Sequence, residues 1–72
     1  MNLMIGDVYE VEFNGSWKTG VYQGIWQNLF ESDKTMSYIF VVTEYHSVHG
    51  SYQFSVHVRQ SDVDTRVRLC QK

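Results

Sequence analysis

Proline is absent from this 72-residue chain, and cysteine occurs only once, as Cys70. One thiol cannot form an internal disulfide, which favours a reducing environment, and we expect the cytoplasm. No apolar run approaches the ~18 residues that a membrane-spanning helix needs. The start of the chain, MNLMIGDVYE, also lacks the basic and apolar segments of a signal peptide. We therefore expect a soluble protein that does not associate with membranes.

Charge is scarce as well. Charged residues make up 19% of the chain and the net charge is −2, which gives no general attraction to nucleic acid. Aromatic residues are plentiful at 15%, within a hydrophobic share of 43%, and this composition excludes disorder. A chain of this length makes one domain, here residues 1–72, and buries only about 60% of the surface of its unfolded form. Such a small core cannot hide all of the aromatic side chains.

The first part of the chain has the pattern of a β-hairpin. Apolar side chains alternate with glutamates over residues 9–13, which is the period of a strand with one buried face. Asn14 and Gly15 follow directly, and both accept the positive φ angles of a two-residue turn. The returning strand contains Gly20 and Gly24, which indicate bulges or sharp bends.

Three further strands follow. Residues 36–45 are apolar on both parities, which predicts a central strand covered on both faces or nearly so. Residues 51–59 alternate cleanly, and the side chains expected in the core are Tyr52, Phe54, Val56 and Val58. A stretch rich in Ser and Asp then favours one helical turn, and residues 65–69 form a short last strand with Val67 and Leu69 inward. The pattern predicts an all-β fold, a small antiparallel barrel.

Several short motifs resemble those of the SH3-like barrels and, among them, the Tudor-type domains. The matching residues are Gly6, Asp7, Val11, Phe13, Asn14, Gly15, Ser16, Trp17, Val21, Ser61, Asp62 and Val63. The resemblance implies a five-stranded antiparallel SH3-like barrel with one short helical turn. It also implies a cage for methylated side chains near Phe13, Trp17, Tyr45 and Tyr52, held by cation–π attraction. The alternative is that these rings close the ends of the barrel. Residues 26–35 have no counterpart in the family.

All three histidines, His46, His49 and His57, lie within one predicted hairpin. With a turn at residues 47–50, His57 lies roughly 20 Å along the strand from the turn. Zinc holds its nitrogen ligands at about 2.0–2.1 Å, so one hairpin cannot supply all three. We expect no metal and no cofactor. The alternative is that His46 and His49 form half of a site, or bridge two molecules.

The residues that could support catalysis lack the surroundings they need. Glu10 and Glu12 share a strand face with Cα atoms roughly 6.6 Å apart, but general acid catalysis needs one carboxyl in an apolar pocket. A solvated strand face is therefore the preferred interpretation. Lys18 lacks the preceding glycine of a phosphate-binding loop, and Cys70 has no evident partner base. We expect no enzymatic activity.

The excess of aromatic residues favours a binding module that acts through protein–protein interaction. Ile25, Trp26, Leu29 and Phe30 have the spacing of one helical turn and could present a hot spot. The expected partner-binding residues are Trp26, Leu29, Phe30, Trp17, Tyr45 and Tyr52. The alternative is that this segment plugs the barrel. A small module of this kind would suit a phage or mobile-element protein that inhibits a host system.

The alternative function is nucleic-acid binding by a small barrel. His57 and Arg59 share one strand face, and Arg66 and Arg68 share a parity in the last strand. If these strands adjoin, the four residues form a basic C-terminal patch that could bind phosphates beside stacking aromatic rings. The acidic first half of the chain opposes this interpretation. An exposed edge strand would also permit a homodimer.

Overall fold

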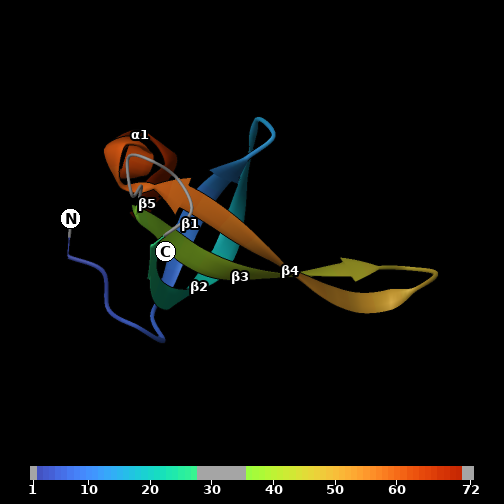
Figure 1. Ribbon diagram of the computed structural model, residues 1–72. Helices are drawn as coiled ribbons and strands as arrows, with labels where there is room; N and C mark the ends of the chain where they lie inside the picture. Colours follow the sequence, from blue (N-terminus) through green and yellow to red (C-terminus); the bar gives the residue numbers. More distant parts are fainter. Residues whose placement is uncertain (1, 28–35, 71–72) are drawn as a thin grey trace.

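The computed structural model describes residues 2–27 and 36–70 of the chain. In chain order, the elements are β1 (Val8–Phe13), β2 (Ser16–Gln27), β3 (Met36–His46), β4 (Gly50–Arg59), the 3₁₀ turn η1 (Gln60–Asp62), the one-turn helix α1 (Val63–Arg66) and β5 (Val67–Leu69) (Figure 1). All strand pairs are antiparallel, and the sheet order is β4-β3-β2-β1-β5. The predicted all-β class, with five antiparallel strands and one short helical turn, is confirmed.

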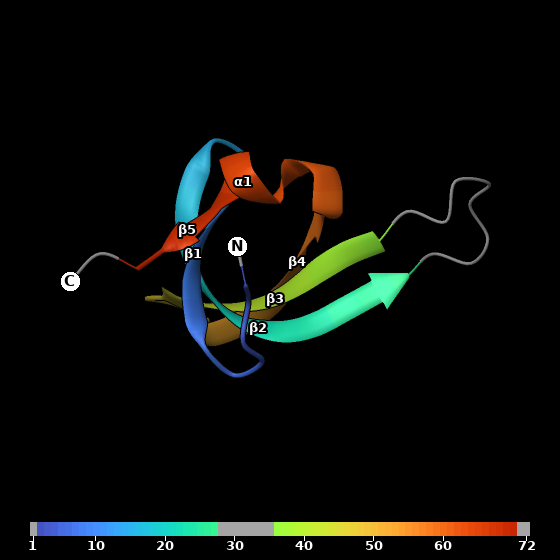
Figure 2. The same ribbon diagram turned by 90° about the vertical axis from the view of Figure 1, so that its left-hand side faces the viewer.

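The sheet curls but does not close into a barrel. Its edges are β4 and β5, and α1 with the preceding turn lies across the open side (Figure 2). The strand β5 has only three residues and pairs with β1 over Tyr9–Val11. The predicted strand over residues 65–69 thus starts later, at Val67, because the preceding residues form α1. In the described sheet β5 pairs with β1 alone, and no ladder joins it to β4.

The predicted turn after β1 is present. Asn14 has a φ of 51° and Gly15 a φ of 81°, the left-handed values that a two-residue hairpin turn of this hand requires. The backbone N–H of Gly15 donates a hydrogen bond of 2.8 Å to Oε1 of Glu12. The register Phe13↔Ser16 follows, and it fixes which side chains of β1 and β2 share a face.

A β-bulge interrupts the β2–β3 ladder between Tyr22 and Gly24, where Gly24 has a φ of 125°. The extra residue moves the end of β2 by one position, so the parity of its side chains is exchanged between the two faces. Trp26 consequently lies on the outer face, opposite Ser37. The helical spacing predicted from Ile25 to Phe30 is wrong at Ile25 and Trp26, which are in a strand. Leu29 and Phe30 lie outside the described residues.

The core lies on the inner face of the curled sheet, beneath α1. Its buried residues are Tyr9, Val11, Tyr22, Phe40, Val42, Val56, Val58, Val63 and Val67. The ring of Tyr9 meets those of Tyr22 and Phe40 edge-on, with centroids 6.5 and 6.2 Å apart. Full burial of a side chain such as Phe40 contributes about 1.5–3 kcal/mol. The inward placement predicted for Val56, Val58 and Val67 is confirmed.

Leu69 and Tyr52 depart from the predicted core. Leu69 is 67% exposed, because it ends the short edge strand β5 and has no further strand beside it. Tyr52 is 47% exposed, although it has the same parity as the buried Val56 and Val58. Strand β4 therefore carries its inner-face side chains past the end of the core.

Candidate functional site

The inner face of the sheet continues beyond the core towards the ends of two hairpins, and there it is open. A cavity of about 520 Å³, here called the hairpin hollow, lies between the β1–β2 hairpin and the β3–β4 hairpin. Its lining residues are Phe13, Asn14, Ser16, Lys18, Glu44, Tyr52, Phe54 and Ser55. The volume falls in the range of about 300–1,000 Å³ that is usual for ligand sites. Ser55 belongs to the edge strand, so the hollow reaches the border of the sheet.

Three aromatic rings form one wall of the hairpin hollow. Phe13 and Phe54 pack with centroids 5.4 Å apart, and the ring of Tyr52 stacks on Phe54 at 6.1 Å. Phe13 and Phe54 also pack against the buried core, so they are held from below. Tyr52 is the most exposed of the three. This wall offers a fixed apolar surface whose outer rim is accessible.

A second wall of the hollow is polar and carries no net charge. Lys18 and Glu44 form an ion pair, and the hydroxyl of Tyr52 donates a hydrogen bond of 2.7 Å to Oε2 of Glu44. The hydrogen bond from Lys18 and then that from Tyr52 lower the pKa of Glu44 from its ordinary value. The same contact raises the pKa of Tyr52. At neutral pH the hollow therefore combines an apolar wall with a carboxylate and an ammonium group that already face each other.

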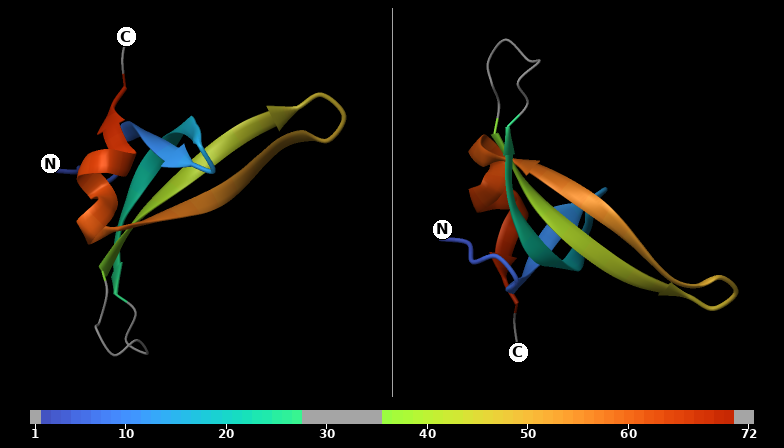
Figure 3. Two further views of the ribbon diagram at one scale, coloured as in Figure 1. Left: turned by 90° about the horizontal axis from the view of Figure 1, so that it is seen from above. Right: turned by 60° about the horizontal axis from the view of Figure 1, so that its bottom comes forward.

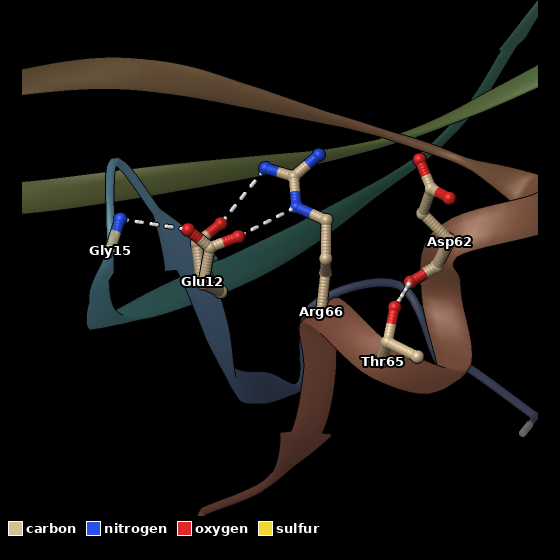
Figure 4. Close-up of polar contacts among 5 residues, drawn as sticks. All are labelled: Glu12, Gly15, Asp62, Thr65 and Arg66. Carbon is tan, nitrogen blue, oxygen red and sulfur yellow. Dashed lines mark hydrogen bonds and ion pairs between the residues drawn. The ribbon is translucent and has the colours of Figure 1, made fainter.

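On the outer face, two ion pairs join β1 to the end of the chain, one from Arg66 in α1 and one from Arg68 in β5. Figure 4 shows the pair between Arg66 and Glu12. Arg66 donates from Nε to Oε2 of Glu12 at 3.0 Å, and from its terminal nitrogen to the carbonyl oxygen of Glu12 at 2.9 Å. Arg68 donates from Nε to Oε1 of Glu10 at 3.0 Å. Because of the backbone hydrogen bond from Gly15, and then Arg66, the pKa of Glu12 is lowered. The two glutamates thus serve as partners for the C-terminal arginines.

The aromatic residues expected to bind a partner are distributed over both faces and both ends of the sheet. Tyr52 lines the hollow, whereas Tyr45 alternates with the inner-face Glu44 and lies on the outer face, 77% exposed. Trp17 is on the outer face too, where its ring lies 3.9 Å from the guanidinium carbon of Arg68. Trp26, in β2, lies beside Ser37 at the start of β3, whereas Tyr45 is near the end of β3. Leu29 and Phe30, outside the described residues, have no place in this comparison.

The four residues of the implied cage are likewise divided. Phe13 and Tyr52 face the hairpin hollow, and Trp17 and Tyr45 do not. The third ring of the hollow is Phe54, which the alternation of residues 51–59 predicts in the core. Alternation predicts Phe54 and Tyr52 on one face, but only the curl of the sheet, which brings β4 towards β1, shows that this face meets Phe13.

The four residues of the basic patch lie on the two edge strands and their connection. His57 and Arg59 belong to β4, and the His57 ring lies 6.3 Å from the ring of Trp26 on the outer face. Arg66 and Arg68, in α1 and β5, are the arginines already paired with glutamates. The sheet order puts β4 and β5 at opposite edges, so no ladder of the described sheet joins the two pairs.

The histidines also separate into two groups. The rings of His46 and His49 stack at 4.8 Å, and Nδ1 of His46 accepts hydrogen bonds from the backbone N–H groups of Val48 and His49. His57 lies opposite Ile39, far along the ladder from this turn. Among the described residues, no three His, Cys, Asp or Glu side chains are grouped so that they could hold a metal ion. His46 has a structural role in the turn.

Comparison of the chain with protein-family models, with curated proteins and with solved structures gives no match. In the part of the chain that the structure describes, no helix has the length and apolar character required to cross a membrane.

Proposed function

We propose that this protein is a non-enzymatic binding module that recognises another protein through the hairpin hollow. The observation that carries the proposal is the aromatic wall of Phe13, Phe54 and Tyr52, which continues from the core into an open cavity. Rings held in place by the core lose little conformational entropy when a ligand covers them. Tyr and Trp at such positions are frequent anchors of protein interfaces.

The polar wall indicates what kind of partner segment fits. An apolar side chain of the partner packs on the accessible side of the contacting Phe13 and Phe54 rings, where it replaces water. A neighbouring polar group of the partner then meets Lys18 and Glu44, whose charges compensate each other. A strongly charged ligand would be repelled by whichever of these two groups has the same charge, so the hollow favours a segment with little net charge.

Matched tyrosine variants test the proposal. Peptides selected from a displayed random library on the intact protein are measured by fluorescence anisotropy against Tyr52→Ser and Tyr45→Ser. Both tyrosines are exposed on the β3–β4 hairpin, but they lie on opposite faces. We expect Tyr52→Ser to weaken binding at least about tenfold, or about 1.4 kcal/mol. Tyr45→Ser should leave binding unchanged. Equal losses in the two variants, or loss only with Tyr45→Ser, would contradict the proposal.

The finer assignments made from the sequence belong to the same proposal. Five antiparallel strands with a helical turn before the last one support kinship with the SH3-like barrels, including the Tudor type. A cytoplasmic location is supported by the single thiol, Cys70. Inhibition of a host system by a phage or mobile-element protein is one form that a protein-binding function would take.

Nucleic-acid binding is the second candidate, and one observation favours it. The exposed ring of Trp26 lies beside His57 on the outer face, and Arg59 follows two residues later on the same face. An aromatic ring near a cationic side chain, here that of Arg59, is a platform on which single-stranded bases stack. Binding of an oligonucleotide that weakens steeply with salt and is lost in Arg59→Ala would support this candidate. Binding without these two properties would contradict it.

A further inference from the structure

The outer edge of β4 is unusually open. This strand is the outermost of the sheet and runs for ten residues, from Gly50 to Arg59. Figure 3 shows the β3–β4 hairpin projecting from the body, and none of the described elements covers the outer edge of the first half of β4. Over Gly50–Val56 there is neither a charged residue nor a proline. Native proteins commonly protect edges with such residues, because an unprotected edge is a template for another strand.

The segment is also complementary to itself. A two-fold axis perpendicular to the sheet pairs antiparallel edges so that each residue faces one of the same parity. With Phe54 on the axis, Phe54 faces Phe54 of the partner subunit, and Tyr52 faces Val56 of the partner subunit. On the outer face Gln53 lies opposite Ser55 of the partner subunit. Apolar side chains therefore meet on the inner face and uncharged polar ones on the outer face.

The position of the two-fold axis follows from how many residues of the two β4 strands can pair. With Phe54 on the axis, residues 50–58 of each strand are opposed, which uses nearly all of β4. Arg59 then falls opposite the turn, beyond the end of the partner's strand, so the two arginines are not brought together. An axis nearer Gly50 would shorten the ladder, and one nearer Arg59 would place the second copy against the α1 end of the molecule.

We propose that two copies of this chain pair through β4, with Phe54 on the two-fold axis, into one continuous sheet. This goes beyond the proposed function, because it makes the site double. Each hairpin hollow borders β4 at Phe54 and Ser55. A two-fold axis perpendicular to the sheet keeps both hollows on the same face, so they open side by side. The interface is small, and we expect a dissociation constant in the micromolar range.

Analytical ultracentrifugation of the intact chain over a concentration series tests the proposal. The double variant Gln53→Lys, Ser55→Lys places amines opposite amines at two positions related by the axis. Both side chains are exposed, and the only contact described for them is the 3.2 Å hydrogen bond from Gln53 to Thr43. We expect the dissociation constant to rise at least about a hundredfold. The control variant Gln23→Lys, Thr43→Lys adds the same charge to exposed positions of the interior strands and should dimerise like the parent.

A third variant tests the register in which the two β4 strands pair. In Gln53→Glu, Ser55→Lys each new carboxylate faces a new amine of the partner, so dimerisation should return to at least the parent level. An axis at residue 53 would instead bring two carboxylates together and prevent the return. A parent chain that stays monomeric up to about millimolar concentration, dimers that persist in the double-lysine variant, or no return in the third variant would each overturn the proposal. Circular dichroism checks that every variant is folded. Peptide binding by Tyr52→Ser, measured on the monomer, is independent of these outcomes.

Discussion

The two ends of the same inner sheet face differ in what covers them. At one end α1 packs against β1 and β4, the turn η1 packs against β3, and Tyr9, Val11 and Phe40 are buried. At the other end the same strands carry Phe13, Lys18 and Tyr52 into the hairpin hollow. The first end stabilises the fold, and the second presents a surface that the fold holds in place. The difference lies in whether a later segment of the chain returns to cover the face.

Along β2 and β3, the inner-face residues change from buried to charged within one inward position. On the inner face of β2, Tyr22 and Gly20 are buried, and the next inward position, Lys18, carries a charge. On β3, Phe40 and Val42 are followed by Glu44, which pairs with Lys18. A charge at this distance from the core keeps the hollow hydrated, whereas a further pair of valines would extend the core by one row.

The largest effect should come from removing a ring at each end. Phe40→Ala leaves a cavity in the covered end, where the side chain is fully buried, and should lower the free energy of unfolding by about 3–5 kcal/mol. Phe54→Ala removes the same number of atoms from the open end, where water can fill the space. We expect less than half of the loss found for Phe40→Ala. Urea unfolding followed by circular dichroism measures both.

Equal losses for the two phenylalanine variants would remove the distinction between the ends. In that case Phe54 would be part of the core, and the hairpin hollow would be a surface of the core and not a separate site. If Phe40→Ala proves too unstable to measure, Val42→Ala gives a smaller loss at the same end of β3.

A smaller effect should come from adding atoms to β2. A Cβ at Gly20 would lie 3.1 Å from Cβ of Phe40 and 3.3 Å from Cγ2 of Val42, both of which are buried. We expect Gly20→Ala to destabilise the protein by about 1–2 kcal/mol, because overpacking outweighs the gain of about 0.5–1 kcal/mol from replacing glycine in a strand. Ser16→Val adds atoms to the same face of the same strand at the open end.

Ser16 lines the hollow and is exposed, so Ser16→Val should change the stability by no more than about 0.5 kcal/mol. Thermal unfolding of both variants against the parent gives the comparison. A loss in Ser16→Val as large as that in Gly20→Ala would show that the hollow is tightly packed in solution.

The sequence was sufficient to predict the strands, the Asn14–Gly15 turn and the helical turn before β5, because each depends on local chemistry. It was not sufficient for the end of β2. One extra residue at the bulge before Gly24 exchanges the two faces, and Trp26 moves from the inner to the outer face. A glycine in a strand indicates that a bulge is near, but it does not show which side chains face inward after the bulge.

The candidate site depended on contacts between residues far apart in the chain. Phe54 meets Phe13 only because the sheet curls and brings β4 towards β1, and Arg66 reaches Glu12 only because α1 ends beside β1. Read in one dimension, the arginines predicted a basic surface and the glutamates an acidic one. The ladder between β1 and β5 brings them together and cancels their charges.

The pH dependence of stability should distinguish one carboxylate on each face of the sheet, Glu12 on the outer face and Glu44 on the inner face. The pKa of Glu12 is lowered by the Gly15 backbone N–H and then by Arg66, and that of Glu44 by Lys18 and then by Tyr52. A lowered pKa in the folded state means that the stabilisation is present above the ordinary value of 4.5 and is lost as the pH falls through the lower folded value. We therefore expect the unfolding free energy to decline below about pH 4.5.

Glu12→Gln and Glu44→Gln should each flatten part of that decline, because neither amide titrates. Urea unfolding at several pH values between about pH 3 and pH 7 measures the slopes. Glu12→Gln should also loosen the ladder between β1 and β5, which hydrogen exchange of the Val67 and Arg68 amides would report. If Glu12→Gln loses stability with the same slope as the parent, the ion pair with Arg66 is not maintained in solution.

The smallest effect should come from removing the hydroxyl of Tyr52 while its ring is kept. Tyr52→Phe removes the 2.7 Å hydrogen bond to Glu44 and keeps the stack on Phe54. The pKa of Glu44 should rise but stay below its ordinary value, since the larger contribution, from Lys18, remains. Lys18→Met should raise it further. Titration of the Glu44 side-chain carboxyl by ¹³C NMR measures both shifts, and a larger shift in Tyr52→Phe would reverse the order of the two contributions. Because the apolar wall is intact in Tyr52→Phe, this variant should still bind the selected peptides that Tyr52→Ser no longer binds. That result would mean that binding at the open end depends on the aromatic rings that continue the core.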